Sequence, residues 1–299
     1  MFVHCDCMLL INYTRYQYGQ RITFLGQGFV SYFAIVVLAL LLTCVVKAAS
    51  ANGQKQVEKE SNINYHKQAA DNTLYFDLGL ASGWVPYQRS AEPGKPGVYA
   101  DLMQSISERS NITIRPVHLP PKRAEKALQT GLVDFDFNVL EWMEDGTPGA
   151  GFVLSEPLYK VTEYVVTTNE HAALFKQKSD YYGHAIGTIA GYFYYDADKF
   201  TRVDFLSEEA LIEGLAMGRF KLIIMEEHAA KYWANEHDVD IVLAVQHTKG
   251  PVRMRLRQEK AHLLPELNRA ISALKSDGTI RRILASHGIQ QEVSLSHKH

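Results

Sequence analysis

The sequence predicts an α/β protein whose body has two similar halves, and three observations support this class. In the first half, short strand patterns alternate with amphipathic helix patterns, which is typical of a sheet of parallel strands covered by helices. The second half repeats this order of elements without repeating the sequence. A single uncharged hydrophobic segment precedes both halves. The length of 299 residues suits about two domains.

The overall composition excludes several classes of protein. The chain is 46% hydrophobic and 21% charged, with a formal net charge of -2, as expected of a globular protein. These values do not fit a disordered, collagenous or multi-span membrane chain. No basic stripe would attract a phosphate backbone, so we expect no nucleic-acid partner.

The N-terminal segment has the pattern of an export signal. Phe29 to Val46 form 18 residues without a charge, Arg15 and Arg21 precede them, and small residues around Ala51 follow. This order predicts a secretory signal that is cleaved after Ala51. The alternative is an uncleaved anchor, because 18 apolar residues are just long enough to span a bilayer. Either way, we expect a periplasmic protein, free or anchored to the inner membrane by residues 29–46.

The segment that follows the signal is polar and aperiodic. Residues 1–51 are therefore assigned to the signal or anchor, and residues 52–72 to a linker. All three cysteines, Cys5, Cys7 and Cys44, lie within or before the hydrophobic stretch. The body consequently cannot form disulfides, and a body without cysteine suits an oxidising compartment.

The first half of the body shows five elements in order. TLYFDLGL alternates apolar and polar residues from Thr73 and predicts a strand. A turn rich in Gly and Pro follows, and then Val98–Ser110 predicts an amphipathic helix. NITIRPV is a second strand, a helix runs from Pro121 to Gly131, and LVDFDFNV is a third strand.

The second half shows a similar succession. A short strand and a Gly-bearing turn lie within YGHAIGTIAGYFYYD. Ser207 is expected to cap a helix that ends at Gly218, and FKLIIM then predicts a buried strand. Near the end, two helices are separated at Asp277-Gly278, and the first of them carries an apolar stripe of Leu264, Leu267, Ile271 and Leu274.

The order of these motifs resembles the type II periplasmic solute-binding family that serves polar amino-acid ABC transporters. The resemblance extends over about residues 73–289. No single motif is specific, but their order and spacing are. The matching segments are WVPY, GVYADLMQSISE, PPKRAEKALQTGLVDF, LSEPLY, IGTIAGY, LAMGRFKLIIMEEHAAKYWA and LNRAISALKSDGTIRRILASHGI.

This resemblance implies an α/β, two-lobed type II periplasmic binding protein fold with two hinge crossings. The crossings are expected near Val161–Asn169 and His247–Leu256. Lobe 1 would then comprise residues 73–164 and 252–299, and lobe 2 residues 165–251. A ligand would bind in the cleft where strand ends of both lobes converge, and the lobes would close by a hinge motion.

The resemblance also implies a function without catalysis. The protein would capture a small polar solute, an amino acid or a related compound, and deliver it to an inner-membrane ABC permease. It would act as a monomer and need no cofactor. Two alternatives remain: an enzyme similar to the cyclohexadienyl dehydratases, with Glu141 or Glu226 as acid or base, and a membrane-tethered ligand-sensing domain.

Five candidate ligand-binding residues lie in the first half. Trp84 and Tyr87 follow the first strand and would stack on a ligand, although aromatic residues there also pack loops. Arg123, in the first turn of a helix, would grip a carboxylate; a salt bridge to a neighbouring loop is the alternative. Asn138 and Glu141 follow the third strand, at the edge where a cleft would open.

Four further candidates are Ser155, Thr188, Tyr192 and Glu226. Ser155, in LSEPLY, would contact the ligand or cap a turn. Thr188 and Tyr192 flank a Gly-bearing turn, where a helix N-terminus would favour a carboxylate. Glu226 ends the FKLIIM strand, where amino-acid binders of this family carry an acidic residue for the ammonium group; its neighbour Glu227 is the alternative.

The sequence departs from the family at one position. Amino-acid binders usually carry an arginine for the α-carboxylate about six residues before the FS of the FSxPY motif. Here that position falls near Pro148, with no Arg or Lys close by. The clamp is therefore absent or relocated, for instance to Arg123. The histidines show no helical pairing and no cysteine partners, so we expect no metal site.

Overall fold

The computed structural model describes residues 72–79, 84–89, 96–119 and 121–290. The predicted signal at 1–51 and all but the last residue of the predicted linker at 52–72 lie outside these residues. Residues 69–299 form one compact unit. Within the described residues, none of the helices is long and apolar enough to cross a membrane.

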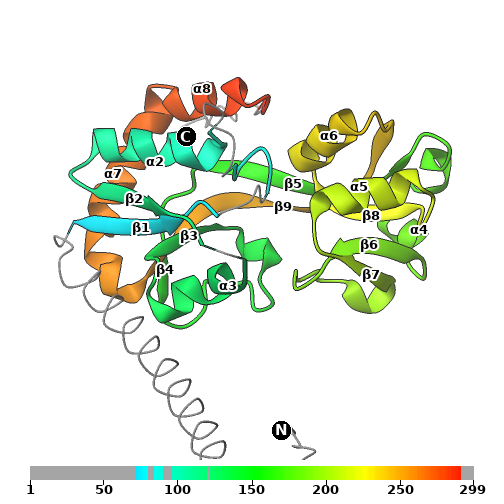
Figure 1. Cartoon of the computed structure of the whole chain (residues 1–299), viewed down its shortest axis with the longest axis horizontal. Coiled ribbons are helices and arrows are strands. Elements are labelled where there is room, and N and C mark those ends of the chain that lie inside the picture. The colour runs from blue at the N-terminus through cyan, green and yellow to red at the C-terminus, as the bar shows by residue number, and fades with distance from the viewer. Residues whose placement is uncertain (1–71, 80–83, 90–95, 120, 291–299) are drawn as a thin grey trace, which may run out of the picture. The chain divides into compact units, whose positions relative to one another are not determined.

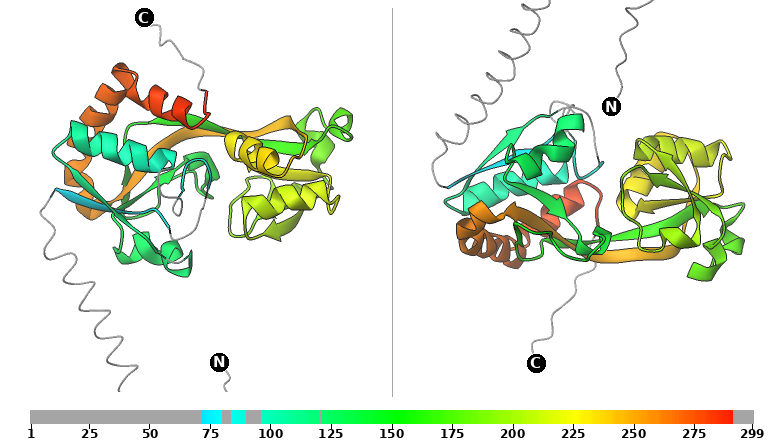
Figure 2. Two further views of the ribbon diagram at one scale, coloured as in Figure 1. Left: turned by 45° about the horizontal axis from the view of Figure 1, so that its top comes forward. Right: turned by 90° about the horizontal axis from the view of Figure 1, so that it is seen from below.

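The elements fall into two α/β groups, which we call lobe 1 and lobe 2, connected by two strands (Figures 1 and 2). The connecting strands are β5 (Tyr159–Thr168) and β9 (Ile241–Arg257). They pair with each other in antiparallel register from Tyr159↔Val252 to Thr168↔Ile241. Both crossings therefore run side by side as one antiparallel pair of strands.

Lobe 1 contains a parallel pair of strands, a further strand beside them, and helices that cover them. β1 and β2 are parallel, and the backbone N–H of Asp134 donates to the carbonyl of Tyr75, which places the start of β3 beside β1. β3 and β4 pair in antiparallel fashion with the end of β9. The elements are β1 (Thr73–Asp77), α2 (Val98–Arg109), β2 (Thr113–Val117), α3 (Pro121–Thr130), β3 (Phe135–Asn138), η1 (Leu140–Trp142), β4 (Phe152–Leu154), η4 (Gln258–Leu263), α7 (Leu264–Ser276) and α8 (Thr279–Ser286).

Lobe 2 is arranged around β8, whose five residues are all buried. β6 pairs in parallel with both β7 and β8, while β8 is antiparallel to β5. The elements are η2 (Ala172–Leu174), α4 (Lys178–Tyr181), β6 (Ala185–Ile189), η3 (Ala197–Lys199), β7 (Thr201–Phe205), α5 (Glu208–Ala216), β8 (Leu222–Glu226) and α6 (Glu227–Glu236).

The continuous apolar run of β8 has a physical reason. Successive side chains of a strand point to opposite faces, and both faces of β8 are covered. Ile223 and Met225 pack into one hydrophobic cluster, whereas Leu222 and Ile224 pack into another. Lobe 1 has a separate core, in which Leu267, Ile271 and Leu274 of the predicted apolar stripe are buried.

Most of the predicted elements are confirmed within two or three residues. The Ser207 hydroxyl accepts a hydrogen bond from the Ala210 N–H and caps α5, and Gly278 separates α7 from α8 with a φ of 74°. One local expectation is wrong: the turn around Gly191 opens no α-helix. It leads instead through the three-residue 3₁₀ helix η3 into β7.

The boundaries assigned to the two lobes, 73–164 with 252–299 and 165–251, stay a prediction. β5 and β9 run continuously through both boundaries, so their middle residues belong to either lobe equally well.

Candidate functional site

A cavity of about 630 Å³ is lined by residues of both lobes and of the connecting strands. Residues at or just after the ends of β1, β3, β6 and β8 contribute to its wall, where polar groups beyond strand ends are typical of binding sites in α/β folds. Its described lining contains an aromatic group, consisting of Phe76, Trp84, Tyr99, Phe137, Trp142, Tyr192, Phe193 and Tyr194 together with Phe135 and Phe152. It also contains six carboxyl groups, those of Asp77, Asp136, Glu144, Glu163, Glu208 and Glu226.

The cavity brings together four of the nine residues predicted from the sequence. Trp84, Asn138, Tyr192 and Glu226 line it. The other five are not part of its described lining: Tyr87, Arg123, Glu141, Ser155 and Thr188. A direct role of any of the nine in ligand binding stays a prediction.

Trp84 and Tyr87 follow β1 but have different surroundings. The Trp84 ring lies 4.1 Å from the Tyr87 ring, centroid to centroid, and faces the cavity. Tyr87 is completely buried, and its hydroxyl donates to Oε1 of Glu226 at 3.0 Å. Burial and the nearby Glu226 carboxylate raise the pKa of Tyr87 well above its ordinary value. Tyr87 therefore acts as a neutral donor that links lobe 1 to lobe 2.

Glu226 lies at the junction of β8 and α6. Its Oε2 accepts hydrogen bonds from the backbone N–H groups of His228 and Ala229, at 2.9 and 3.0 Å, and so caps α6. Its Oε1 lies 3.0 Å from Nδ1 of His228 in addition to accepting from Tyr87. Glu226 is only 4% exposed, and both of its carboxylate oxygens have partners within the protein.

Asn138 and Tyr192 are the other two predicted residues in the wall. Asn138 directs its Nδ2 toward the sulfur of Met143 at 3.4 Å, while its buried Oδ1 has no hydrogen-bond partner among the described residues. A ligand donor would satisfy this oxygen. Tyr192 is 50% exposed and follows the turn around Gly191.

Four predicted residues lie elsewhere. Arg123 is exposed on α3. The Glu141 carboxylate lies over Gly250 of β9, so closely that a Cβ there would be 2.1 Å from its Oε2. Ser155 is buried and accepts the N–H of Met254, and Thr188 is buried and donates to Asp204 at 2.7 Å. These two hydroxyls have structural partners that the sequence patterns did not reveal.

The family of the chain is decided by its sequence. Residues 77–290 match the bacterial extracellular solute-binding proteins, family 3. The chain belongs to this family. The membership confirms the resemblance inferred from the order of WVPY, LSEPLY and the later motifs.

Solved structures confirm the two-lobed fold expected of a family 3 protein. A mutant of ArgBP from T. maritima has a TM-score of 0.60 at 17% identity, over 76% of this chain and 99% of that one. AbpA from Streptococcus pneumoniae, bound to L-arginine, has a TM-score of 0.59 at 16% identity, over 72% of this chain and 94% of that one. The ancestral amino acid-binding protein AncCDT-1, a precursor of cyclohexadienyl dehydratase, has a TM-score of 0.60 at 17% identity, over 76% of this chain and 98% of that one. No curated protein matches the chain.

The only basic side chain in the described lining of this family 3 cavity is that of Arg255. Its Nε and Nη2 contact the two oxygens of Asp136 at 3.0 and 2.5 Å. Its Nη1 lies 3.4 Å from the carbonyl of Pro148, the position where the family's clamp arginine was expected. Burial raises the pKa of Asp136, and Arg255 opposes this rise. A guanidinium from β9 thus reaches the clamp region, but a carboxylate of the protein already holds it.

Sequence reasoning missed most of the other residues of the wall, among them Glu163, Glu208, Arg255 and Trp142. Glu208 lies within the helix that the sequence predicted after Ser207 but was not a site candidate, and Glu163 and Arg255 lie in the crossing strands, where no site was expected. Trp142 had no signal beyond its residue type. Glu208 is the one that sequence could have indicated, because it belongs to the N-terminal turn of a helix that follows a strand.

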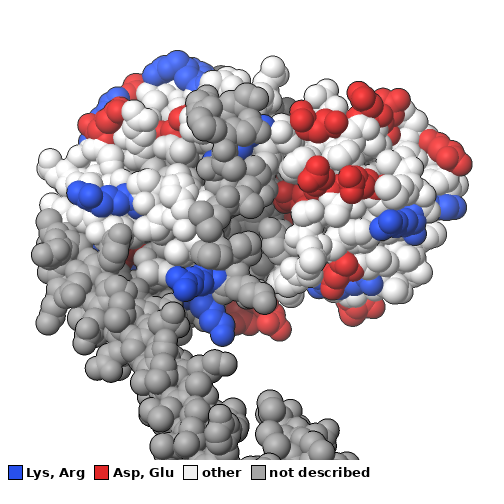
Figure 3. Space-filling view, viewed as in Figure 1, with Lys and Arg blue, Asp and Glu red and all other residues white. Residues whose placement is uncertain are grey.

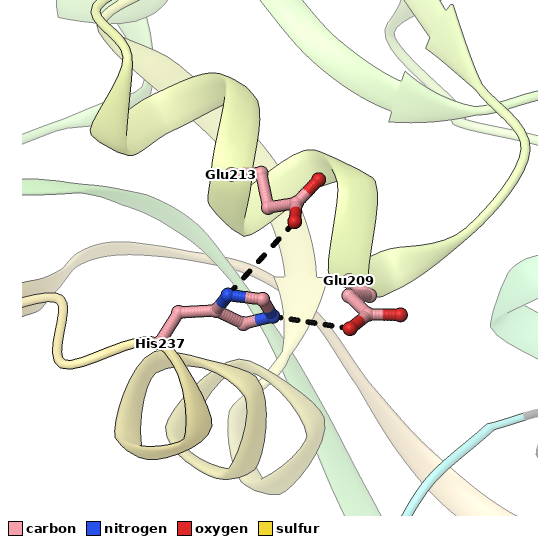
Figure 4. A group of neighbouring side chains, drawn as sticks. All are labelled: Glu209, Glu213 and His237. Carbon is pink, nitrogen blue, oxygen red and sulfur yellow. Dashed lines mark hydrogen bonds and ion pairs between the residues drawn. The ribbon is translucent and has the colours of Figure 1, made fainter.

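A surface cluster outside the cavity joins α5 to the end of α6 (Figure 4). Nε2 of His237 lies 3.2 Å from Glu209, and Nδ1 lies 3.9 Å from Glu213. Their ligand-type atoms lie within 4.8 Å of one another, as metal binding would require. Each ring nitrogen, however, faces a different carboxylate, which is the arrangement of an ion-paired histidine on a surface.

Proposed function

We propose that the protein is an exported binding protein that captures a small polar solute and delivers it to an inner-membrane ABC permease. The observation that carries this proposal is the cavity of about 630 Å³ lined by both lobes and by both connecting strands. Cavities of about 300–1,000 Å³ are typical of small-molecule sites. The protein would work as a monomer in the periplasm, without a cofactor.

The connection between the lobes suits capture by closure. β5 and β9 are the two strands that run between the lobes (Figure 1). The cavity wall includes Glu163 of β5 and Arg255 of β9. A bend in this pair of strands would change the distance between the two walls of the cavity. Membership of family 3 supports solute binding, while delivery to a permease rests on the proposal.

A thermal-stability screen tests solute binding. Residues 69–299 form a compact unit with cores in both lobes, so a chain that begins at Asn52 retains every described element. A solute at a hundredfold excess over its Kd should stabilise this protein by about 2.7 kcal/mol. The screen should include amino acids, amines, short peptides and organic acids. If no solute raises the melting temperature, the proposal fails.

Export is tested separately. Mass spectrometry of the protein from periplasmic extracts should show a mature N-terminus at Asn52 if the signal is cleaved after Ala51. A chain that keeps residues 29–46 and sediments with the inner membrane would instead favour the anchored form, and with it the ligand-sensing alternative.

The enzyme alternative is favoured by one comparison, the likeness to AncCDT-1, which is itself described as an amino acid-binding protein and a precursor of cyclohexadienyl dehydratase. An acid or base would have to act in the cavity. Of the two residues considered for that role, Glu226 lines the cavity and Glu141 does not. Incubation with prephenate or arogenate decides between the two functions, because a binding protein leaves both compounds unchanged.

A further inference from the structure

We propose that the cavity takes a small organic cation without a carboxylate, namely an aliphatic amine or guanidine, rather than an α-amino acid. This inference rests on the proposed function and names the class of solute. It follows from three features of the wall: carboxylates from lobe 2 and β5, aromatic rings from lobe 1, and an arginine that is already paired.

Three carboxylates, from lobe 2 and from the connecting strand β5, line the cavity. Glu163 comes from β5, Glu226 from the end of β8, and Glu208 from the first turn of α5. Among the described residues, no Lys, Arg or His pairs with Glu208, and Glu163 uses only Oε2, which accepts from Thr248 at 2.6 Å and lies 3.3 Å from His247. These two groups therefore retain capacity to accept hydrogen bonds from a ligand.

The carboxylates also affect one another. Glu208 has access to solvent through the cavity, yet enclosure by protein raises its pKa well above the ordinary value. The charges of Glu226 and Glu163 raise it further, and the indole of Trp233 partly offsets the rise. A ligand cation would relieve this repulsion, whereas a second anion would increase it.

Aromatic rings of lobe 1 also line the cavity. Trp84 and Trp142 meet edge to face with their centroids 5.4 Å apart, and both line the cavity. The indole N–H of Trp142 donates to Thr248 at 3.0 Å, which in turn donates to Glu163. The tryptophan is thereby held in a fixed orientation relative to a carboxylate. Indole faces attract cations, so rings and carboxylates favour the same kind of ligand.

Among the described residues of the wall, a carboxylate ligand lacks a comparable partner. The six carboxyl groups of the described wall are opposed by one guanidinium, and Asp136 holds that guanidinium through two hydrogen bonds. An α-amino acid would have to displace Asp136 or leave its own carboxylate facing like charges. Removal of that carboxylate eliminates the conflict and leaves the cationic part of the ligand unchanged.

The surface of α5, next to this wall, is also negatively charged. α5 carries Glu208, Glu209 and Glu213 and no basic residue. Figure 3 shows acidic side chains gathered over α5 and α6. Such a surface attracts cations and repels anions before they bind.

Matched pairs of ligands provide the test. Agmatine, cadaverine and putrescine are arginine, lysine and ornithine without the α-carboxylate. Calorimetric titration of the protein that begins at Asn52 should give each amine at least about tenfold higher affinity than its amino acid. Equal or higher affinity for the amino acids, or preferential binding of an organic acid, would overturn the inference and leave the proposed function intact. If no solute of any class binds, both fail.

A charge variant tests the wall itself. Glu208→Gln keeps the shape of the side chain and should lower amine affinity about tenfold, because a partly buried charge partner is lost. Glu236→Gln removes the same charge from an exposed position of α6 outside the described lining and should leave affinity unchanged. Amine affinity that is equal in the two variants would contradict the inference. The ligand pairs decide the question alone if Glu208→Gln does not fold.

Discussion

At the scale of single residues, His247 shows how charge is accommodated inside the fold. Its side chain is fully buried in β9, with Nε2 2.8 Å from Asp196 and Nδ1 3.3 Å from Glu163. Burial alone would lower the pKa of His247, but the hydrogen bonds and charges of Asp196 and Glu163 outweigh burial and raise it above 6.5. The protonated imidazole is consequently favoured in the folded protein.

This raised pKa predicts a specific pH dependence of stability. The pKa of His247 is higher in the folded chain than in the unfolded one, so its charge stabilises the fold fully below about pH 6.5. That contribution is lost as the pH rises through the raised pKa. His247→Gln should therefore lower the free energy of unfolding by roughly 3 kcal/mol near pH 5.5, and by less near pH 8.

Urea denaturation of both proteins across this pH range measures the difference. His262→Gln, in η4 of lobe 1, is a control for loss of a histidine outside this cluster. A deficit of His247→Gln that is the same at both pH values would contradict the assignment of a charged imidazole.

The residues of the candidate site differ in how far sequence reveals them. Trp84 and Asn138 follow strands, and a residue beyond a strand end is a sound candidate because such ends meet at one edge of a sheet. Glu163 and Arg255 reach the cavity from within the long strands β5 and β9, where pairing register decides which way a side chain points. Ser155 lies in the LSEPLY motif expected at the site, yet its hydroxyl accepts a hydrogen bond from the backbone N–H of Met254 in β9.

At the scale of elements, the caps of the helices of lobe 2 are expected to stabilise the fold. Ser207 accepts the Ala210 N–H at 3.2 Å and thereby satisfies one of the free donors at the start of α5. Ser207→Ala should lower the free energy of unfolding by about 1 kcal/mol, whereas Ser207→Asp should retain most of it. Urea denaturation of the three proteins checks this. Equal loss in both variants would show that the cap does not stabilise the helix.

The elements that sequence patterns missed have identifiable causes. α6 begins at a glutamate cap, Glu226, which also ends β8, so no Ser, Thr, Asp or Asn marks its start. β7 is a strand at the edge of the sheet with no fully buried residue, and its alternation is weak. β5 and β9 were located only through the family resemblance, because each passes from one lobe to the other and its burial pattern changes on the way.

At the scale of the whole molecule, direct contacts between the lobes accompany the two connecting strands. Tyr87 of lobe 1 donates to Glu226 of lobe 2, and Arg89 donates to the Tyr232 hydroxyl on α6 at 2.6 Å. Arg89 also lies over the Tyr232 ring, 5.1 Å from its centroid. These contacts favour an arrangement in which the lobes approach each other, and the proposed closure of the lobes would make or break them.

Tyr87→Phe should shift the balance between open and closed arrangements without unfolding either lobe. The ring and its stacking remain, but the hydrogen bond to the Glu226 carboxylate, worth about 1.5–3 kcal/mol to a charged group, is lost. We expect a larger radius of gyration by X-ray scattering in the absence of solute, and about tenfold weaker binding of whichever solute the screen identifies. Tyr182→Phe, at an exposed tyrosine of lobe 2, should change neither quantity. If Tyr87→Phe matches that control in both measurements, the Tyr87–Glu226 contact does not contribute to closure, and the hinge strands alone determine how the lobes are placed.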